Sequence, residues 1–172
     1  VMSSASFSLA GQHVEALVLG GSAAINGSGN SLANSLTGNG AANGLSGGDG
    51  NDQLFGRGGN DSLRGGAGAD SFCFDSGLSG TANVDIIADF SAVDDTIRLS
   101  RAVFTGVSAN GTLAASAFAA GTAAADADDR IVYDSATGKI FYDADGSGAG
   151  AAVLFAQVSA GTALTAADFV AY

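Results

Sequence analysis

Five consecutive rows of nine residues carry one apolar side chain and one Asn or Asp at fixed positions. The rows begin at Gly29, Gly38, Gly47, Gly56 and Gly65. Position eight of each row is apolar: Leu36, Leu45, Leu54, Leu63 and Phe72. Position six is polar: Asn34, Asn43, Asp52, Asp61 and Asp70. A period of nine with one apolar position fits neither an amphipathic helix nor a hairpin ladder, and it indicates a repeat architecture.

The first six positions of each row predict a turn, because Gly, Asn and Asp tolerate a positive φ angle. The last three positions, such as 53–55, are long enough only for a very short strand. Two rows then make one coil with a strand on each side. We expect Leu36, Leu54 and Phe72 to stack in one sheet, facing Leu45 and Leu63 in the other. One buried apolar side chain per row stabilises less than the ordering of nine residues costs, so the rows need a further source of stability.

The flanking segments lack the period. Residues 1–28 alternate apolar and polar positions, and we interpret them as the N-terminal entry of the roll: either its first coil or two, or a cap that covers its open end. Beyond the rows, 84–90 and 95–100 are strand-like, 131–158 predicts a three-stranded meander, and 113–127 predicts a short helix. Thr165 is a candidate helix N-cap with Asp168 three residues later. The predicted fold is all-β: a parallel β-roll, that is, a right-handed β-helix of nonapeptide repeats, over 29–74, and a small antiparallel β-sandwich over 75–172.

Charge narrows the class of partner. The chain has 172 residues with a formal net charge of −11, and Glu15 is its only glutamate, so the acidic side chains are almost all Asp. This balance argues against nucleic acids and anionic membranes, whose protein ligands are Lys and Arg, and favours a cation. The single Cys73 excludes an intramolecular disulfide, and no apolar run is long enough to insert in a membrane.

The rows predict calcium sites between turns that stack two rows apart. Calcium takes six to eight oxygen ligands in adaptable geometry, whereas magnesium demands a tighter octahedron and zinc prefers His and Cys. Asp52 with Asp70 is the best pair, and Asn43 with Asp61 and Asn34 with Asp52 are weaker because an amide oxygen is uncharged. Asp85, Asp94 and Asp95 are a minor alternative for closing the last site. The expected carbonyl donors are Gly47, Asp49, Gly50, Gly56, Gly58, Gly59, Gly65, Gly66 and Gly68.

Three rows, GGDGNDQLF, GRGGNDSLR and GGAGADSFC, resemble the RTX nonapeptide G-G-x-G-x-D-x-U-x, a calcium-binding repeat. Residues 74–100 and 131–158 resemble the region after the repeats in RTX proteins exported by type I secretion, including serralysin-type proteases. The ending 168–172 resembles their terminal secretion signal. The resemblance implies calcium ions and a type I secretion apparatus as partners. It also implies a secreted, extracellular protein that folds when it meets calcium outside the cell.

Other motifs carry less weight. Residues 44–48 match G-x-S-x-G around Ser46, but they lie inside the repeat and lack a His base, so we expect no catalysis. The only histidine, His13, is not part of an H-E-x-x-H motif. Residues 143–148 resemble the start of an EF-hand loop, and a hairpin turn is the favoured interpretation. A polysaccharide- or cell-surface-binding module remains the competing function, and the oligomeric state stays open.

Overall fold

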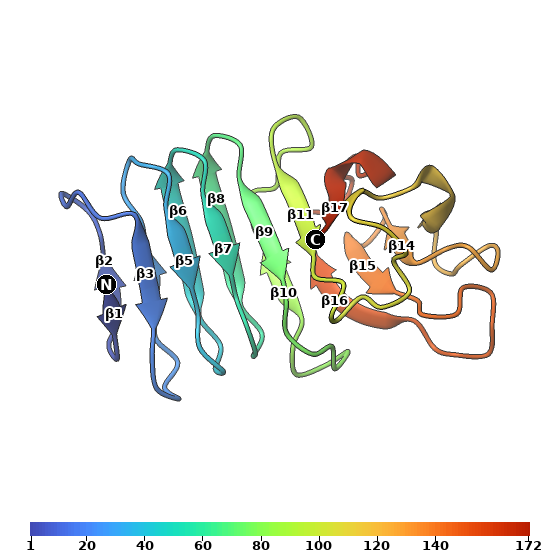
Figure 1. The fold of residues 1–172 in the computed structure, drawn as a ribbon, viewed down its shortest axis with the longest axis horizontal. Helices are drawn as coiled ribbons and strands as arrows, with labels where there is room; N and C mark the ends of the chain where they lie inside the picture. The colour runs from blue at the N-terminus through green and yellow to red at the C-terminus, as the bar shows by residue number, and fades with distance from the viewer.

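The computed structural model describes residues 1–172, and almost all of its regular structure is β (Figure 1). The strands of the roll are β1 (Met2–Ser3), β2 (Phe7–Ser8), β3 (Ala16–Leu19), β4 (Gly27–Ser28), β5 (Ser35–Thr37), β6 (Gly44–Asp49), β7 (Gln53–Phe55), β8 (Ser62–Ala67) and β9 (Ser71–Phe74). The later strands are β10 (Asp85–Ile87), β11 (Thr96–Leu99), β12 (Gly111–Thr112), β13 (Phe118–Ala120), β14 (Ile131–Asp134), β15 (Lys139–Tyr142), β16 (Val153–Gln157) and β17 (Phe169–Ala171). Two single-turn 3-10 helices are η1 (Ala115–Ala117) and η2 (Ala166–Asp168).

The strands form two facing sheets that run the length of the molecule (Figure 1). The first sheet has the order β1-β3-β5-β7-β9-β11-β17-β12, and the second has the order β13-β14-β15-β16-β10-β8-β6-β4-β2. Successive strands of the repeat alternate between the sheets, and each pairs in parallel with the strand two along the chain. This arrangement confirms the predicted all-β fold with a parallel β-roll.

The apolar position of each row forms the predicted stacks. Leu36 pairs with Leu54, and Leu54 with Phe72, in the first sheet. Leu45 pairs with Leu63 in the second sheet. These side chains are buried between the sheets, and all belong to a single hydrophobic core. The stacks therefore hold the row spacing fixed, so every turn lies directly against the turn one coil away.

Residues 1–28 are themselves coils of the roll. β1 pairs in parallel with β3, and β2 pairs in parallel with β4. The sequence separation between paired residues is less constant here than in the repeat, because it differs between the pair Met2 and Val18 and the pair Ala16 and Ser35. Leu9, Leu17 and Leu19 extend the core into this end of the molecule.

The C-terminal part continues the same two sheets. β10 pairs in parallel with β8, and β11 pairs in parallel with β9. Ile87 and Ile97 prolong the apolar stacks, which explains why the sheets do not end with the last row. The predicted antiparallel meander is present as β14, β15 and β16, and β16 joins it to β10 in parallel. In the first sheet the antiparallel pair of β12 and β17 lies at the far edge, whereas in the second sheet the edge strand β13 pairs in parallel with β14, next to the meander.

Two helical predictions have different outcomes. The segment 113–127 forms only the single turn η1 before β13 begins, so the expected helix is reduced to a 3-10 turn. At η2 the side chain of Thr165 accepts a hydrogen bond from a helix N–H, and Asp168 accepts one from the Thr165 backbone, which is the predicted capping arrangement. No helix of the chain has the length and apolarity that a bilayer span would require.

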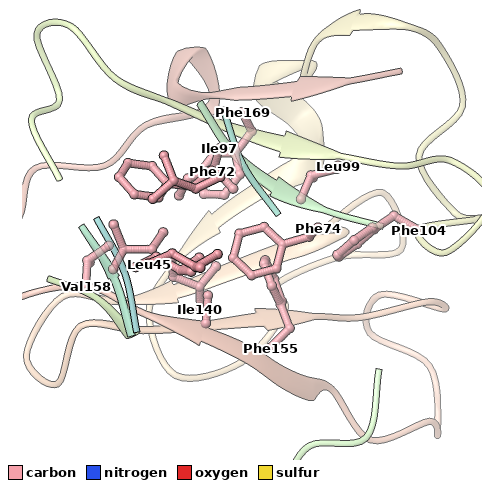
Figure 2. Close-up of a cluster of buried hydrophobic side chains, with 14 of the residues drawn as sticks. Leu45, Phe72, Phe74, Ile97, Leu99, Phe104, Ile140, Phe155, Val158 and Phe169 are labelled. Carbon is pink, nitrogen blue, oxygen red and sulfur yellow. The ribbon is translucent and has the colours of Figure 1, made fainter. Parts of the chain in front are cut away.

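The hydrophobic core continues from the roll into the C-terminal strands (Figure 2). Phe74 and Phe104 each pack edge-on against Phe155, with ring centroids 5.1 Å apart in both pairs. Phe72, Ile97 and Phe169 lie together on the other side of this cluster (Figure 2). Phe169 is fully buried, and its strand β17 lies between β11 and β12, inside the first sheet. Phe169 and Ala171 of β17 are therefore part of the folded core.

Candidate metal sites

The Asp at position six of the last three rows is buried inside the turn that joins the two sheets. Asp52, Asp61 and Asp70 are each at most 2% exposed. One carboxylate oxygen of each accepts a backbone N–H from position six of the coil before it. The N–H of Asn34 donates to Asp52 Oδ1 at 2.7 Å, and that of Asp52 donates to Asp70 Oδ1 at 2.9 Å. Asn43 donates to Asp61 Oδ1 in the same way, at 2.7 Å. Stacking thus produces a ladder of buried acids.

The ladder continues beyond the rows. Asp61 donates its N–H to Asp85 Oδ1 at 3.0 Å, and Asp70 donates its N–H to Asp95 Oδ1 at 2.9 Å. The separation is 18 residues inside the rows but 24 and 25 residues in these two pairs. Asp85 and Asp95 are both buried, whereas Asp94 is exposed. Of the three acids considered from the sequence for closing the last site, the structure brings only these two into the ladder.

The other carboxylate oxygen of each row Asp has no partner. Oδ2 of Asp52, Asp61 and Asp70 is buried and accepts no hydrogen bond. A buried charged oxygen that lacks a partner is costly, because it has lost water without gaining a donor. Three such atoms at equivalent positions indicate that each turn is shaped around something that the carboxylates bind.

The first glycine of each row makes room at this point. A Cβ on Gly47 would strike Asp52 Oδ2 and would lie 2.6 Å from the carbonyl oxygen of Gly65, one coil away. A Cβ on Gly56 would meet Oδ2 of Asp61 and, at 2.8 Å, Oδ2 of Asp85. Oxygens from two stacked turns therefore converge on one small space beside each of these glycines.

The electrostatics of the ladder disfavour the charged carboxylates. Burial raises the pKa of Asp52 to about 6, against the lowering effect of the Asn34 N–H and with a further increase from the charge of Asp70. Burial likewise raises the pKa of Asp61 to about 6 and that of Asp85 to about 8. Burial also raises the pKa values of Asp70 and Asp95.

No basic side chain neutralises the ladder. The two ion pairs of the chain join Arg57 to Asp75 at 2.9 Å and Arg64 to Asp89 at 3.5 Å. Both arginine side chains are about half exposed or more, and neither forms an ion pair with an acid of the ladder. The compensating charge must therefore come from outside the chain, as a proton or as a bound cation.

The chemistry of these oxygens fits calcium. The protein has no group of three or more His, Cys, Asp or Glu side chains arranged to hold a metal ion, so a cation here would take carboxylate oxygens in pairs and complete its shell with carbonyls. Calcium accepts such a mixed oxygen shell, and zinc does not favour it. Two of the expected carbonyl donors, Asp49 and Gly66, lie in stacked turns, because Asp49 pairs with Ala67 and Gly66 pairs with Gly48 across β6 and β8. Gly50 and Gly59, at position four, have φ angles of 104° and 105° that suit glycine.

The two Asn turns differ from the Asp turns. Asn34 Oδ1 accepts the N–H of Asn30 at 2.7 Å, and its Nδ2 donates to the carbonyl of Val14 at 3.2 Å. Asn43 likewise accepts the N–H of Asn39 at 2.8 Å and donates to the carbonyl of Ile25 at 2.7 Å. Both side chains occupy the ladder positions that the sequence predicts, and both already have hydrogen-bond partners within the protein.

Comparison with known proteins supports the repeat assignment. The family model for the RTX calcium-binding nonapeptide repeat, which spans four copies, matches residues 28–62 and 46–77. No curated protein matches the chain. The matched residues cover strands β5 to β9 and the turns that carry Asp52, Asp61 and Asp70. The buried acids and the family match thus coincide on the same turns.

Proposed function

We propose that this chain, which carries RTX calcium-binding nonapeptide repeats, is a secreted module that folds when it binds calcium. The observation that carries the proposal is the set of three buried carboxylate oxygens without a hydrogen-bond partner. In the folded protein such oxygens require a counter-charge, and no Arg or Lys side chain forms an ion pair with them.

Calcium would be held by carboxylates of the ladder together with glycine carbonyls such as that of Gly65. When bound, it supplies positive charge inside the turns and cross-links each turn to the next. The residues themselves set the geometry: the Oδ1 hydrogen bonds fix each carboxylate, and Gly47 and Gly56 leave the space free. Because these sites exist only when the turns are stacked, the free energy of binding contributes directly to folding.

The same coupling supports a role in export. Extracellular calcium modules bind with dissociation constants of roughly 10⁻⁴–10⁻³ M, so they stay empty in the cytosol and fill outside the cell. The tail 168–172 would have to be recognised by a type I secretion apparatus before folding, because β17 is buried inside the first sheet. An unfolded, threadable chain inside the cell and a calcium-folded chain outside are consistent with both requirements.

We propose further that the chain has no catalytic activity of its own. Ser46 lies within β6, paired with Ser28 and Arg64 in neighbouring strands. The G-x-S-x-G motif works at a sharp turn between a strand and a helix, which places the serine at the end of a sheet. Ser46 has no such setting.

An export assay tests this function. A reporter fused before Val1 and expressed with a type I apparatus is expected to reach the medium, and removal of residues 168–172 is expected to stop it. With about 1 mM calcium the exported chain should resist protease, and with chelator it should be digested. Export that survives the removal would contradict the role of the tail. Equal protease resistance in both media would contradict calcium-driven folding.

A further inference from the structure

The acid pairs of the ladder share one geometry. In each pair the first Asp has a buried Oδ2 without a partner, and the second Asp accepts the N–H of the first through Oδ1. Three pairs meet both conditions: Asp52 with Asp70, Asp61 with Asp85, and Asp70 with Asp95. Only the first of these lies wholly within the residues that match the repeat family.

The two pairs that begin with Asn meet only the second condition. Asp52 accepts the N–H of Asn34, and Asp61 accepts that of Asn43. The oxygen of Asn34 and the carbonyl of Gly47 do converge beside Gly29, as in the Asp turns. That amide oxygen, however, already accepts the N–H of Asn30.

Position two of the row explains this difference. Gly48, Arg57 and Gly66 hold position two of the Asp rows with φ angles of 115°, 73° and 107°. Asn30 and Asn39 hold it in the Asn rows without a positive φ, and their N–H groups turn inward to the amide oxygens. The Asn turns are therefore closed by hydrogen bonds, whereas the Asp turns leave a charged oxygen free.

Beyond the rows, the pair of Asp61 and Asp85 is the most complete. Both Oδ2 atoms face the space beside Gly56, so two carboxyl oxygens from stacked turns meet there. Asp61 is 2% exposed and Asp85 is 4% exposed. Asp95 occupies the equivalent position in the turn that follows Asp70. Its Oδ2 accepts the N–H of Ser91 at 2.8 Å.

We infer that the calcium sites are displaced toward the C-terminus relative to the repeats. The turns of Asn34 and Asn43 bind no ion, and Asp85 and Asp95 complete the last two sites outside the repeats. The inference rests on the proposed calcium binding and specifies which positions bind. The chain then holds three ions, one for each unpartnered carboxylate oxygen. The Asn turns are the metal-free beginning of the repeats.

Counting the bound ions tests the inference. Native mass spectrometry of the calcium-saturated chain should give three ions, and two ions for Asp85→Asn and for Asp95→Asn. Asp94→Asn, at the exposed neighbouring position, is the matched control and should keep three. Asn34→Ala and Asn43→Ala should also keep three. Loss of an ion from either Asn variant, or full occupancy in Asp85→Asn and Asp95→Asn, would overturn the inference.

Ion positions in the unaltered chain give a second test that does not depend on how variants fold. Strontium is a heavier stand-in for calcium, and its anomalous diffraction should place ions between Asp61 and Asp85 and between Asp70 and Asp95. An ion beside Asn34 or Asn43, or none at the last two pairs, would contradict the displacement. A chain that binds no calcium at all would instead refute the proposed function, so the two failures are distinguishable.

Discussion

At the scale of the residue, each row Asp has a different use for its two carboxylate oxygens. Oδ1 of Asp70 accepts the N–H of Asp52, which fixes the side chain, and Oδ2 remains buried without a partner. An Asn at the same position has an amide N–H donor and no negative charge. In Asn43 this amide nitrogen donates a hydrogen bond to the carbonyl of Ile25. The amide donor and the inward N–H of position two together leave the Asn turns without a charged oxygen that lacks a partner.

The glycine at position one gives a direct test of the space beside the carboxylate. Gly47→Ala should weaken calcium binding and lower the stability of the calcium-loaded protein by about 1–3 kcal/mol, because its Cβ would collide with Asp52 Oδ2. Gly40→Ala is the matched control, since its Cβ would meet nothing within 4 Å, and it should change stability by less than about 0.5 kcal/mol. Thermal unfolding in excess calcium measures both, and equal effects would argue against a crowded site.

The raised pKa values predict an unusual pH dependence without metal. A carboxyl with a higher pKa when folded binds protons more tightly in the folded state, so stability falls as pH rises. In chelator, the folded fraction should therefore decrease from pH 4 through the pKa of about 6 of Asp52 and Asp61. The decrease should continue toward the pKa of about 8 of Asp85. Circular dichroism between pH 4 and 8 checks this, and a folded fraction that rises with pH would contradict it.

At the scale of the element, the strands are too short to be stable alone. β5 and β7 have three residues each, and one buried leucine in each, Leu36 and Leu54, faces the core. Their stability comes from the stack, because each leucine lies between equivalent side chains of the coils above and below. Ile97 continues the stack from Phe72 into the C-terminal part.

Removing one member of the stack should affect the whole roll. Leu54→Ala is expected to destabilise the calcium-loaded protein by about 2–5 kcal/mol, since Leu54 is fully buried between Leu36 and Phe72. Leu32→Ala is the control, because Leu32 is 37% exposed in a turn, and its effect should be much smaller. Denaturant unfolding in calcium compares the two, and similar midpoints would show that the stack contributes little.

The sequence predicts the elements well where the period is strict. The spacing of nine is enough to place Leu45 against Leu63 and Asp52 against Asp70. It does not place Asp85 or Asp95 in the ladder, because the intervening loops change the separation between partners from 18 residues to 24 and 25. The sequence also does not predict that the Asn turns are closed by hydrogen bonds. That closure depends on the direction of one backbone N–H at position two of each row.

At the scale of the whole molecule, the roll and the tail are linked through one strand. β11 follows Asp95 directly, and it pairs with β9 of the repeat on one side and with β17 on the other. Binding at Asp70 and Asp95 would hold β11 in place. β11 is the strand with which β17, which carries Phe169, forms its parallel pair. Calcium is thus expected to determine whether the C-terminus is accessible.

Hydrogen exchange checks this link. The amides of 169–171 should be protected in calcium and exchange freely in chelator. Asp95→Asn should reduce their protection, and Asp94→Asn should not. Protection that is independent of calcium would show that the tail folds without the roll.

We expect calcium to provide the stability that the short strands of the roll lack, and far-UV circular dichroism measures this most directly. In chelator at pH 7.5 we expect the spectrum of a largely unfolded chain. Addition of about 1 mM calcium should produce a β-sheet spectrum that chelator reverses, and the same concentration of magnesium should not produce it. A full β-sheet spectrum in excess chelator, unchanged when calcium is added, would show that calcium does not stabilise the fold.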